Sequence, residues 1–106
     1  MRKVEQVEFS SGSHLMPVHI TLLTQERCGF CEQAQATLER LTREYPLALT
    51  YIDLASAEGR RLELEHGVLF APGVLLDGAF FSYGRLSERK LRRALAKLSQ
   101  PPQSDR

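Results

Sequence analysis

Both cysteines of the chain lie in the segment QERCGFCEQAQATLERL, residues 25–41, where two residues separate Cys28 from Cys31. A pair at this spacing can exchange a disulfide with a substrate, supply half of a metal site, or form a structural cross-link. Two cysteines are too few for the disulfide framework of a small secreted protein, and the N-terminus lacks the apolar segment of a secretory signal. We therefore expect a cytoplasmic protein. In the reducing cytosol a close pair is more often catalytic or metal-binding than structural.

The metal and structural interpretations of the pair are weaker than the redox one. A zinc site needs four ligands, commonly including a second close pair of Cys or His residues. His14, His19 and His66 are scattered along the chain, so we expect no metal site. A structural disulfide at this spacing would cross-link a single helical turn and remove little chain entropy. Thiol–disulfide exchange is the chemistry that the pair favours.

The sequence around the pair predicts a junction between a strand and a helix. Residues 18–23, VHITLL, are typical of a short strand, and a helix begins at Cys28 or Gly29 after a loop that contains Arg27. Backbone N–H groups at the helix N-terminus, the helix dipole and the Arg27 cation all favour a thiolate at Cys28. Cys31 lies one turn further, on the apolar stripe, so we expect it to be more buried. Cys28 is the predicted nucleophile and Cys31 the predicted resolving thiol.

Strands and helices alternate along the rest of the chain. Asp77-Gly78 predicts a two-residue hairpin turn, because both positions need positive φ, and Ser56 and Ser87 are typical helix caps. The continuous apolar run of residues 47–54 predicts a strand that is buried on both faces. Strands joined by a helix are parallel, so the order β-α-β-α-β-β-α predicts an α/β fold with a four-stranded mixed sheet and flanking helices. The expected strands are 18–23, 47–54, 74–76 and 79–83, and the expected helices are 29–45, 56–66 and 87–98, the last with Leu91, Ala94, Leu95 and Leu98 toward the core.

The two ends of the chain differ from the part between them. Residues 1–15 contain a linker-like Ser-Ser-Gly-Ser-His run, which fits a leader added for expression, a flexible arm or an extra edge strand. Residues 99–106 carry two prolines and no apolar pattern, so a disordered tail is expected there. One domain is expected over residues 16–98. The whole chain has 42% apolar and 25% charged residues and no long apolar run, which is typical of a soluble protein.

The charge of the chain is concentrated in one segment. The formal net charge is only +1, so neither nucleic acid nor a membrane surface is an expected partner. Residues 82–98 nevertheless carry a net charge of +5, with Glu88 as their only acidic residue. This pattern fits the solvated face of a helix, a docking surface for an acidic partner, or a site for the carboxylate of a small substrate. The basic residues are Arg85, Arg89, Lys90, Arg92, Arg93 and Lys97.

Residues 18–98 resemble the thioredoxin-like superfamily, and within it the small glutaredoxin-like proteins. The resemblance rests on Cys28-Gly29-Phe30-Cys31 at the strand-to-helix junction, on Pro72 before the third strand, and on the element order. It implies a thioredoxin/glutaredoxin-like fold and a thiol–disulfide oxidoreductase that acts on protein or glutathione disulfides. It also implies that Ala71-Pro72 is the cis-proline loop facing the cysteines, whose backbone pairs with an extended substrate.

The sequence departs from the common motifs of this superfamily at several positions. Many thioredoxins have Trp where this chain has Arg27 and Gly-Pro where it has Gly29-Phe30. Many glutaredoxins have Thr-Val where it has Phe70-Ala71, and a Gly-Gly pair where it has Gly84-Arg85. By resemblance, Gly84 lets the backbone approach a ligand, and Arg85 or Arg89 meets a carboxylate of glutathione. Arg27 and an exposed Phe30 complete the expected substrate contacts.

Two functional hypotheses follow. The first is a thiol–disulfide oxidoreductase without a bound cofactor, with glutathione as a co-substrate and with glutathione or a reductase as the electron donor. The second is a redox-sensing or partner-binding module that holds a partner with its basic last helix and uses the cysteine pair as a switch.

Overall fold

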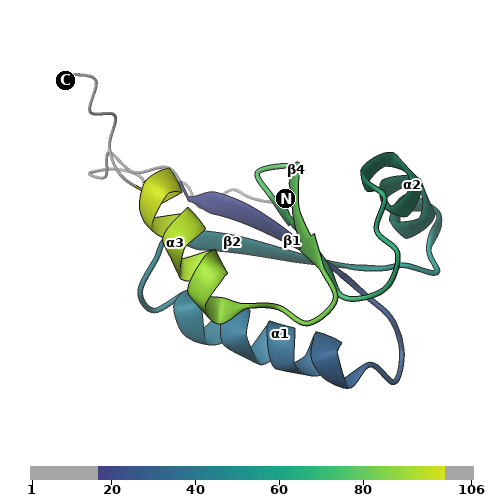
Figure 1. Ribbon diagram of the computed structural model, residues 1–106, viewed down its shortest axis with the longest axis horizontal. Helices are drawn as coiled ribbons and strands as arrows, with labels where there is room; N and C mark the ends of the chain where they lie inside the picture. Colours follow the sequence, from purple (N-terminus) through teal and green to yellow (C-terminus); the bar gives the residue numbers. More distant parts are fainter. Residues whose placement is uncertain (1–16, 100–106) are drawn as a thin grey trace.

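A computed structural model describes residues 17–99, which form a four-stranded sheet with three helices (Figure 1). The strand order is β2-β1-β3-β4, in which β1 is parallel to β2 and antiparallel to β3, and β3 is antiparallel to β4. The predicted fold class and element order are therefore confirmed. The elements are β1 (Val18–Thr24), α1 (Gly29–Leu41), β2 (Leu47–Asp53), α2 (Ala57–His66), β3 (Gly73–Leu76), β4 (Ala79–Tyr83) and α3 (Glu88–Ser99).

The hairpin between β3 and β4 follows from two residues. Asp77 and Gly78 have φ angles of 51° and 83°, the left-handed values that a two-residue hairpin turn requires. Asp77 also fixes the hairpin to β1, because its carboxylate oxygen accepts a hydrogen bond from the His19 backbone N–H at 2.8 Å. This places β3 in the middle of the sheet, where all four of its residues are buried.

The sheet separates two apolar clusters. Neighbouring residues of a strand point to opposite faces, so Leu22 packs toward α1 and α3, whereas Leu23 packs toward α2. Figure 1 shows α1 and α3 together on one side of the sheet and α2 apart from them. The cluster under α1 and α3 comprises Val18, Ile20, Leu22, Ala34, Leu38, Leu41, Val74, Leu76, Leu91 and Leu95, and the one under α2 comprises Leu23, Leu62, Val68 and Leu75.

Three expectations about the elements are wrong. Strand β2 is not buried on both faces: it pairs only with β1 among residues 17–99, and each of its residues is half-buried or exposed. Helix α1 ends at Leu41 instead of Tyr45: Arg43 and Glu44 donate to carbonyls three residues back instead of four, and Pro46 disfavours helical backbone at Tyr45. Leu98 is 46% exposed, because α3 continues beyond the core that Leu91 and Leu95 reach.

Ion pairs join α1 to α3. Arg92 donates to both carboxylate oxygens of Glu44, at 2.7 and 2.9 Å, and its Nε donates to Glu88 at 3.0 Å. Arg40 of α1 completes the cluster by donating to both oxygens of Glu88, at 3.0 and 3.2 Å. The hydrogen bonds from Arg92 hold the pKa of Glu44 below its usual value. Among the helices of residues 17–99, none has the length and apolar character needed to cross a membrane.

Candidate redox site

Cys28 is the N-cap residue of α1. Its backbone is extended, with φ −117° and ψ 101°, and its sulfur accepts a hydrogen bond from the Cys31 backbone N–H at 3.1 Å. The sulfur therefore lies at the positive end of the helix dipole and satisfies one of the N–H groups that the first turn leaves unpaired. A negative charge on this sulfur is stabilised by both effects, so the reduced form of the site favours a thiolate at Cys28.

The two cysteines form a disulfide whose Cα atoms are 5.1 Å apart. Cys31 is only 4% exposed and belongs to the buried stripe of α1, whereas Cys28 is half-buried. The predicted placement at the helix start and the predicted difference in burial are both confirmed. Cys28 is therefore the more exposed of the two cysteines.

The loop before β3 lies at the same edge of the sheet as the disulfide. The Ala71–Pro72 peptide bond is cis, as the resemblance implies, and both residues are buried. Gly73 pairs with Leu23 near the carboxyl end of β1, from which the chain continues to Cys28. The Pro72 carbonyl accepts a hydrogen bond from the Gly84 N–H at 2.9 Å. The structure therefore brings together three of the predicted substrate contacts, Ala71, Pro72 and Gly84.

Gly84 is covered by an aromatic side chain that the sequence did not indicate. Gly84 has φ +83°, and a Cβ atom added to it would lie 3.1 Å from Cε1 of Phe70. Phe70 is itself 57% exposed and packs edge-on against Tyr83, with ring centroids 5.0 Å apart. A ligand that approaches the Gly84 backbone from this side therefore has to displace the Phe70 ring.

A cavity of about 430 Å³ opens at the carboxyl ends of the parallel strands β1 and β2. In open α/β sheets this edge is the usual place for ligands. The lining combines a guanidinium, a carboxylate and an amide with two exposed apolar side chains, a mixture that suits a polar ligand with an apolar part. The lining residues are Gln25, Leu54, Ala55, Arg60, Glu63, Leu69 and Phe70.

Sequence reasoning missed this cavity because its walls come from separate loops and from α2. One signal was present: Leu69-Phe70 is an apolar pair outside any amphipathic pattern, directly before Ala71-Pro72. Both side chains are exposed, and exposed apolar side chains beside a cavity indicate a contact surface.

The remaining predicted contacts lie on the surface. Arg27 is exposed and has φ 55°, an uncommon backbone conformation for a residue other than glycine. Phe30 is 47% exposed, in agreement with its prediction as an exposed side chain, and Arg85 is exposed directly after Gly84. No group of three or more His, Cys, Asp or Glu residues that could hold a metal ion occurs within residues 17–99.

Comparisons with known proteins agree with this geometry. A family described as Glutaredoxin-like domain (DUF836) matches residues 19–96. A comparison with curated protein sequences finds no match. Solved structures of thioredoxins and thioredoxin-like proteins share the fold at low sequence identity.

Three of these structures show the extent of the similarity. A mutant thioredoxin from Halobacterium salinarum has a TM-score of 0.63 at 23% identity, over 78% of this chain and 75% of that one. An uncharacterized thioredoxin-like protein from Clostridium perfringens has a TM-score of 0.65 at 17% identity, over 90% and 79%. Thioredoxin from Fasciola hepatica has a TM-score of 0.61 at 18% identity, over 78% and 82%. The chain therefore belongs to the glutaredoxin-like domain family (DUF836) and has the thioredoxin-like fold.

Proposed function

We propose that this protein is a thiol–disulfide oxidoreductase in which Cys28 attacks the substrate and Cys31 resolves the intermediate. The observation that carries the proposal is the half-buried Cys28 at the N-cap of α1, bonded to the buried Cys31. A sulfur held in this position is both stabilised as a thiolate and open to a substrate, which are the two requirements of a nucleophilic cysteine.

The reaction needs two displacement steps. The Cys28 thiolate attacks one sulfur of a substrate disulfide, forms a mixed disulfide with it, and releases the other sulfur as a thiolate that takes up a proton. The Cys31 thiol then loses its proton and attacks the Cys28 sulfur, which releases the second substrate thiol. The substrate gains two electrons, and the protein ends with the Cys28–Cys31 disulfide. Two donor thiols, from glutathione or from a reductase, reverse these steps and restore the dithiol.

The groups around Cys28 suit a peptide or glutathione substrate. An extended peptide can pair with the backbone of Ala71, since Pro72 has no N–H and its carbonyl already accepts from Gly84. Phe30, two residues after Cys28, offers an exposed apolar side chain. Arg60 in the cavity, or Arg85 after Gly84, can bind a substrate carboxylate. Arg27 adds a cation next to Cys28 that attracts anionic substrates.

The test is the reduction of a small mixed disulfide, coupled to glutathione and glutathione reductase, by wild type, Cys28→Ser and Cys31→Ser. Cys28→Ser is expected to lose all activity. Cys31→Ser is expected to accumulate a mixed disulfide or to retain only activity that depends on glutathione. Wild-type activity in Cys28→Ser would overturn the proposal. If wild type is inactive with glutathione but its cysteines still form a disulfide, the donor is a reductase, and thioredoxin reductase is the next one to assay.

The basic surface of α3 favours a second candidate, a redox-sensing module that holds a protein partner. In this function the cysteine pair switches the affinity for the partner instead of turning over. Capture of a defined partner that depends on Arg89 and Arg93, and that persists in Cys28→Ser, would favour the module over the enzyme.

A further inference from the structure

Helix α3 carries a set of cations that the α1–α3 ion pairs leave unused. Arg92 binds Glu44 and Glu88, and Glu88, the only acidic residue of the segment 82–98, is also bound by Arg40. The other basic residues of the segment are exposed and form no ion pair with any carboxylate of residues 17–99. These residues are Arg85, Arg89, Lys90, Arg93 and Lys97.

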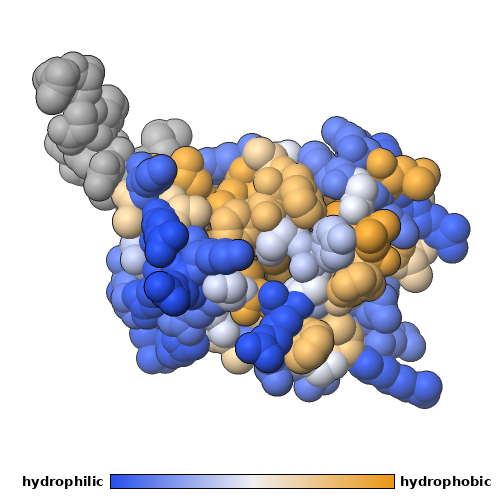
Figure 2. All heavy atoms as spheres, viewed as in Figure 1, coloured by the Kyte–Doolittle hydropathy of each residue, from blue (hydrophilic) through white to orange (hydrophobic). Residues whose placement is uncertain are grey.

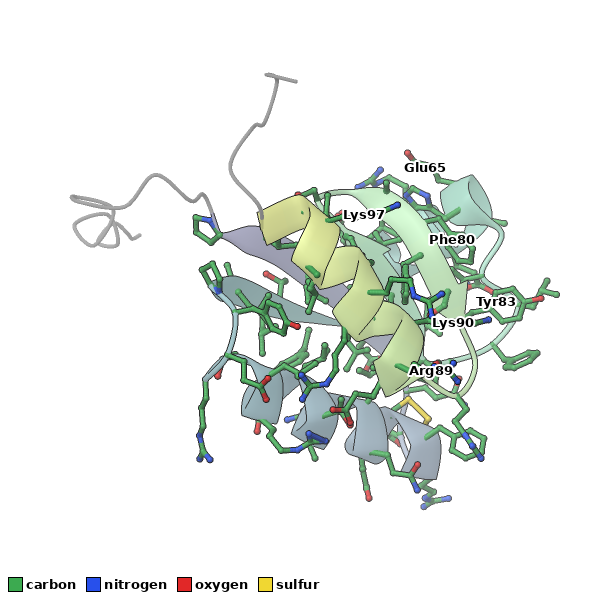
Figure 3. All side chains as sticks on the ribbon, turned by 60° about the vertical axis from the view of Figure 1, so that its left-hand side comes forward. Glu65, Phe80, Tyr83, Arg89, Lys90 and Lys97 are labelled. Carbon is green, nitrogen blue, oxygen red and sulfur yellow. A yellow bond between two sulfur atoms is a disulfide. The ribbon has the colours of Figure 1, made fainter. Side chains whose placement is uncertain are left out.

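Several of these cations form a strip beside strand β4. Lys90, Arg93 and Lys97 follow helical spacing and therefore share one side of α3, over about 10 Å of its length. Figure 3 shows Lys90 and Lys97 extending from α3 toward β4, where Phe80 and Tyr83 lie. Figure 2 shows hydrophilic side chains over α3 next to an apolar area between α3 and α2, the region that β4 occupies in Figure 1.

Two aromatic side chains lie on the other side of β4. Phe80 is 43% exposed, and its ring centroid lies 6.1 Å from that of Tyr83. Phe80 pairs with Leu75 in the sheet register, so its side chain is on the α2 face of the sheet, at the end that α2 leaves open. Tyr83 packs on the same α2 cluster, so the aromatic side chains and the cations of α3 lie on opposite faces of the sheet, on the two sides of the outer edge of β4. We call this edge, with Lys90, Arg93 and Lys97 on one side and Phe80 and Tyr83 on the other, the α3–β4 face.

Strand β4 adds a backbone edge to this face. Within residues 17–99 it pairs only with β3, so its outer edge presents unpaired N–H and C=O groups. Lysines beside such an edge discourage pairing with a second copy of the chain, which would bring the same cations. The same charges attract a strand that carries carboxylates. The cations beside the edge therefore favour pairing with an acidic strand over pairing with β4 of a second copy of the chain.

We propose that the α3–β4 face binds an extended acidic segment of the protein whose disulfide is exchanged at Cys28. The segment would add a strand to β4, place its carboxylates against the lysines, and pack an apolar side chain on Phe80. A peptide is favoured over a nucleic acid because a strand edge offers backbone hydrogen bonds that only a peptide can pair along its length. This inference rests on the proposed function for its choice of partner.

The position of the face relative to the sulfur supports this role. Strand β4 ends at Tyr83, and the next residue, Gly84, is hydrogen-bonded to Pro72 of the cis-proline loop. Figure 3 shows Arg89, at the start of α3, at the same end of the molecule as the disulfide. A segment that pairs along β4 therefore runs toward the end of the molecule that contains Cys28.

The test compares two short peptides of equal length, one rich in Asp and Glu and one rich in Lys. Each carries a mixed disulfide with a coloured aromatic thiol, whose release reports attack by Cys28. We expect wild type to react about tenfold faster with the acidic peptide at low salt, and this advantage to shrink between about 0.02 and about 0.5 M salt. The double variant Lys90→Glu/Lys97→Glu is expected to lose the advantage while it reduces a small uncharged disulfide at the wild-type rate.

Arg43→Glu is a control for charge, because Arg43 is an exposed cation in the turn after α1. It should keep most of the advantage of the acidic peptide. Equal rates for the two peptides in wild type, or an equal loss of the advantage in Arg43→Glu, would overturn the inference.

A binding experiment separates this inference from the proposed function. Fluorescence anisotropy of the labelled acidic peptide with Cys28→Ser/Cys31→Ser measures docking without chemistry, and hydrogen exchange of β4 amides measures strand addition. We expect binding that Lys90→Glu/Lys97→Glu weakens about tenfold, together with slower exchange in β4. Absence of binding, binding without protection of β4, or tighter binding of single-stranded DNA than of the peptide would contradict the inference even if disulfide exchange is confirmed.

Discussion

The helices α1 and α2 begin in the same way, at the carboxyl ends of two neighbouring parallel strands, but with different caps. The Cys28 sulfur accepts from the N–H three residues ahead at 3.1 Å, and the Ser56 hydroxyl oxygen does the same at 3.0 Å. Serine is among the preferred caps, whereas sulfur is a weak acceptor. The cap of α2 stabilises its helix, and the cap of α1 holds the Cys28 sulfur in the same geometry.

The burial of the two helices explains why α1 can carry the weaker cap. Helix α1 buries Cys31, Ala34, Leu38 and Leu41, whereas α2 buries only Gly59 and Leu62. Helical stability in proteins comes mainly from packing of the apolar face. Packing therefore holds α1 in place, which leaves its N-cap position available for the proposed redox chemistry.

Cys28→Ser converts the start of α1 into a copy of the start of α2 and is expected to have the largest effect on activity. Disulfide exchange should fall to background, since a hydroxyl cannot replace the thiolate. The free energy of unfolding under reducing conditions should stay within about 1 kcal/mol of wild type, because Ser is a good N-cap. Urea denaturation measures the second quantity. A large loss of stability would show that the sulfur has a structural role that the comparison does not assign to it.

Leu38→Ala and Leu62→Ala test the difference in packing between the two helices. Leu38 is fully buried between α1 and the sheet, whereas Leu62 is slightly exposed on a helix with little other apolar burial. We expect Leu38→Ala to lower the free energy of unfolding by about 3–5 kcal/mol and Leu62→Ala by about 2 kcal/mol. Leu64→Ala on the exposed side of α2 serves as the control and should have little effect. Equal losses at Leu38 and Leu62 would contradict the comparison.

Ser56→Ala removes the cap of α2 and leaves α1 intact. The loss of the hydrogen bond to Gly59 should lower the free energy of unfolding by about 1 kcal/mol, while the rate of disulfide exchange stays unchanged. Hydrogen exchange should show the loss of protection in the first turn of α2. A fall in the rate of disulfide exchange as large as that of Cys28→Ser would mean that the starts of α1 and α2 are not functionally separate.

Local signals predicted the parts of the site that depend on few residues. Cys28 at a strand-to-helix junction and Asp77-Gly78 in a hairpin are set by backbone preferences that act within a few positions. The prediction that β2 is buried on both faces was wrong, because an apolar run does not reveal which strand lies at the edge of a sheet. The packing of Phe70 on Gly84, and the cavity beside α2, could not be predicted, since they join segments whose distance depends on the whole fold.

Ion pairs tie α1 and the turn after it to α3, whereas Arg61 on α2 pairs only with carboxylates of its own helix. Arg92 lowers the pKa of Glu44 in the folded protein from 4.5. A lowered folded pKa gives stability that is present above the unfolded pKa and is lost as the pH falls through the folded value. Glu44→Gln should therefore be slightly less stable than wild type at pH 7, and the difference should vanish in acid. Thermal unfolding at several pH values measures it; a difference that grows on acidification would contradict the assignment.

The most direct test of the central claim, that the N-cap position activates Cys28, is the pH dependence of its alkylation by iodoacetamide in the reduced protein, read by mass spectrometry. The control is an unstructured peptide with the sequence of residues 25–33, which keeps the same neighbours without the helix. We predict half-maximal alkylation at a pH of about 7 or below for the protein and about 8.5 for the peptide. The same pH dependence in both would contradict the claim.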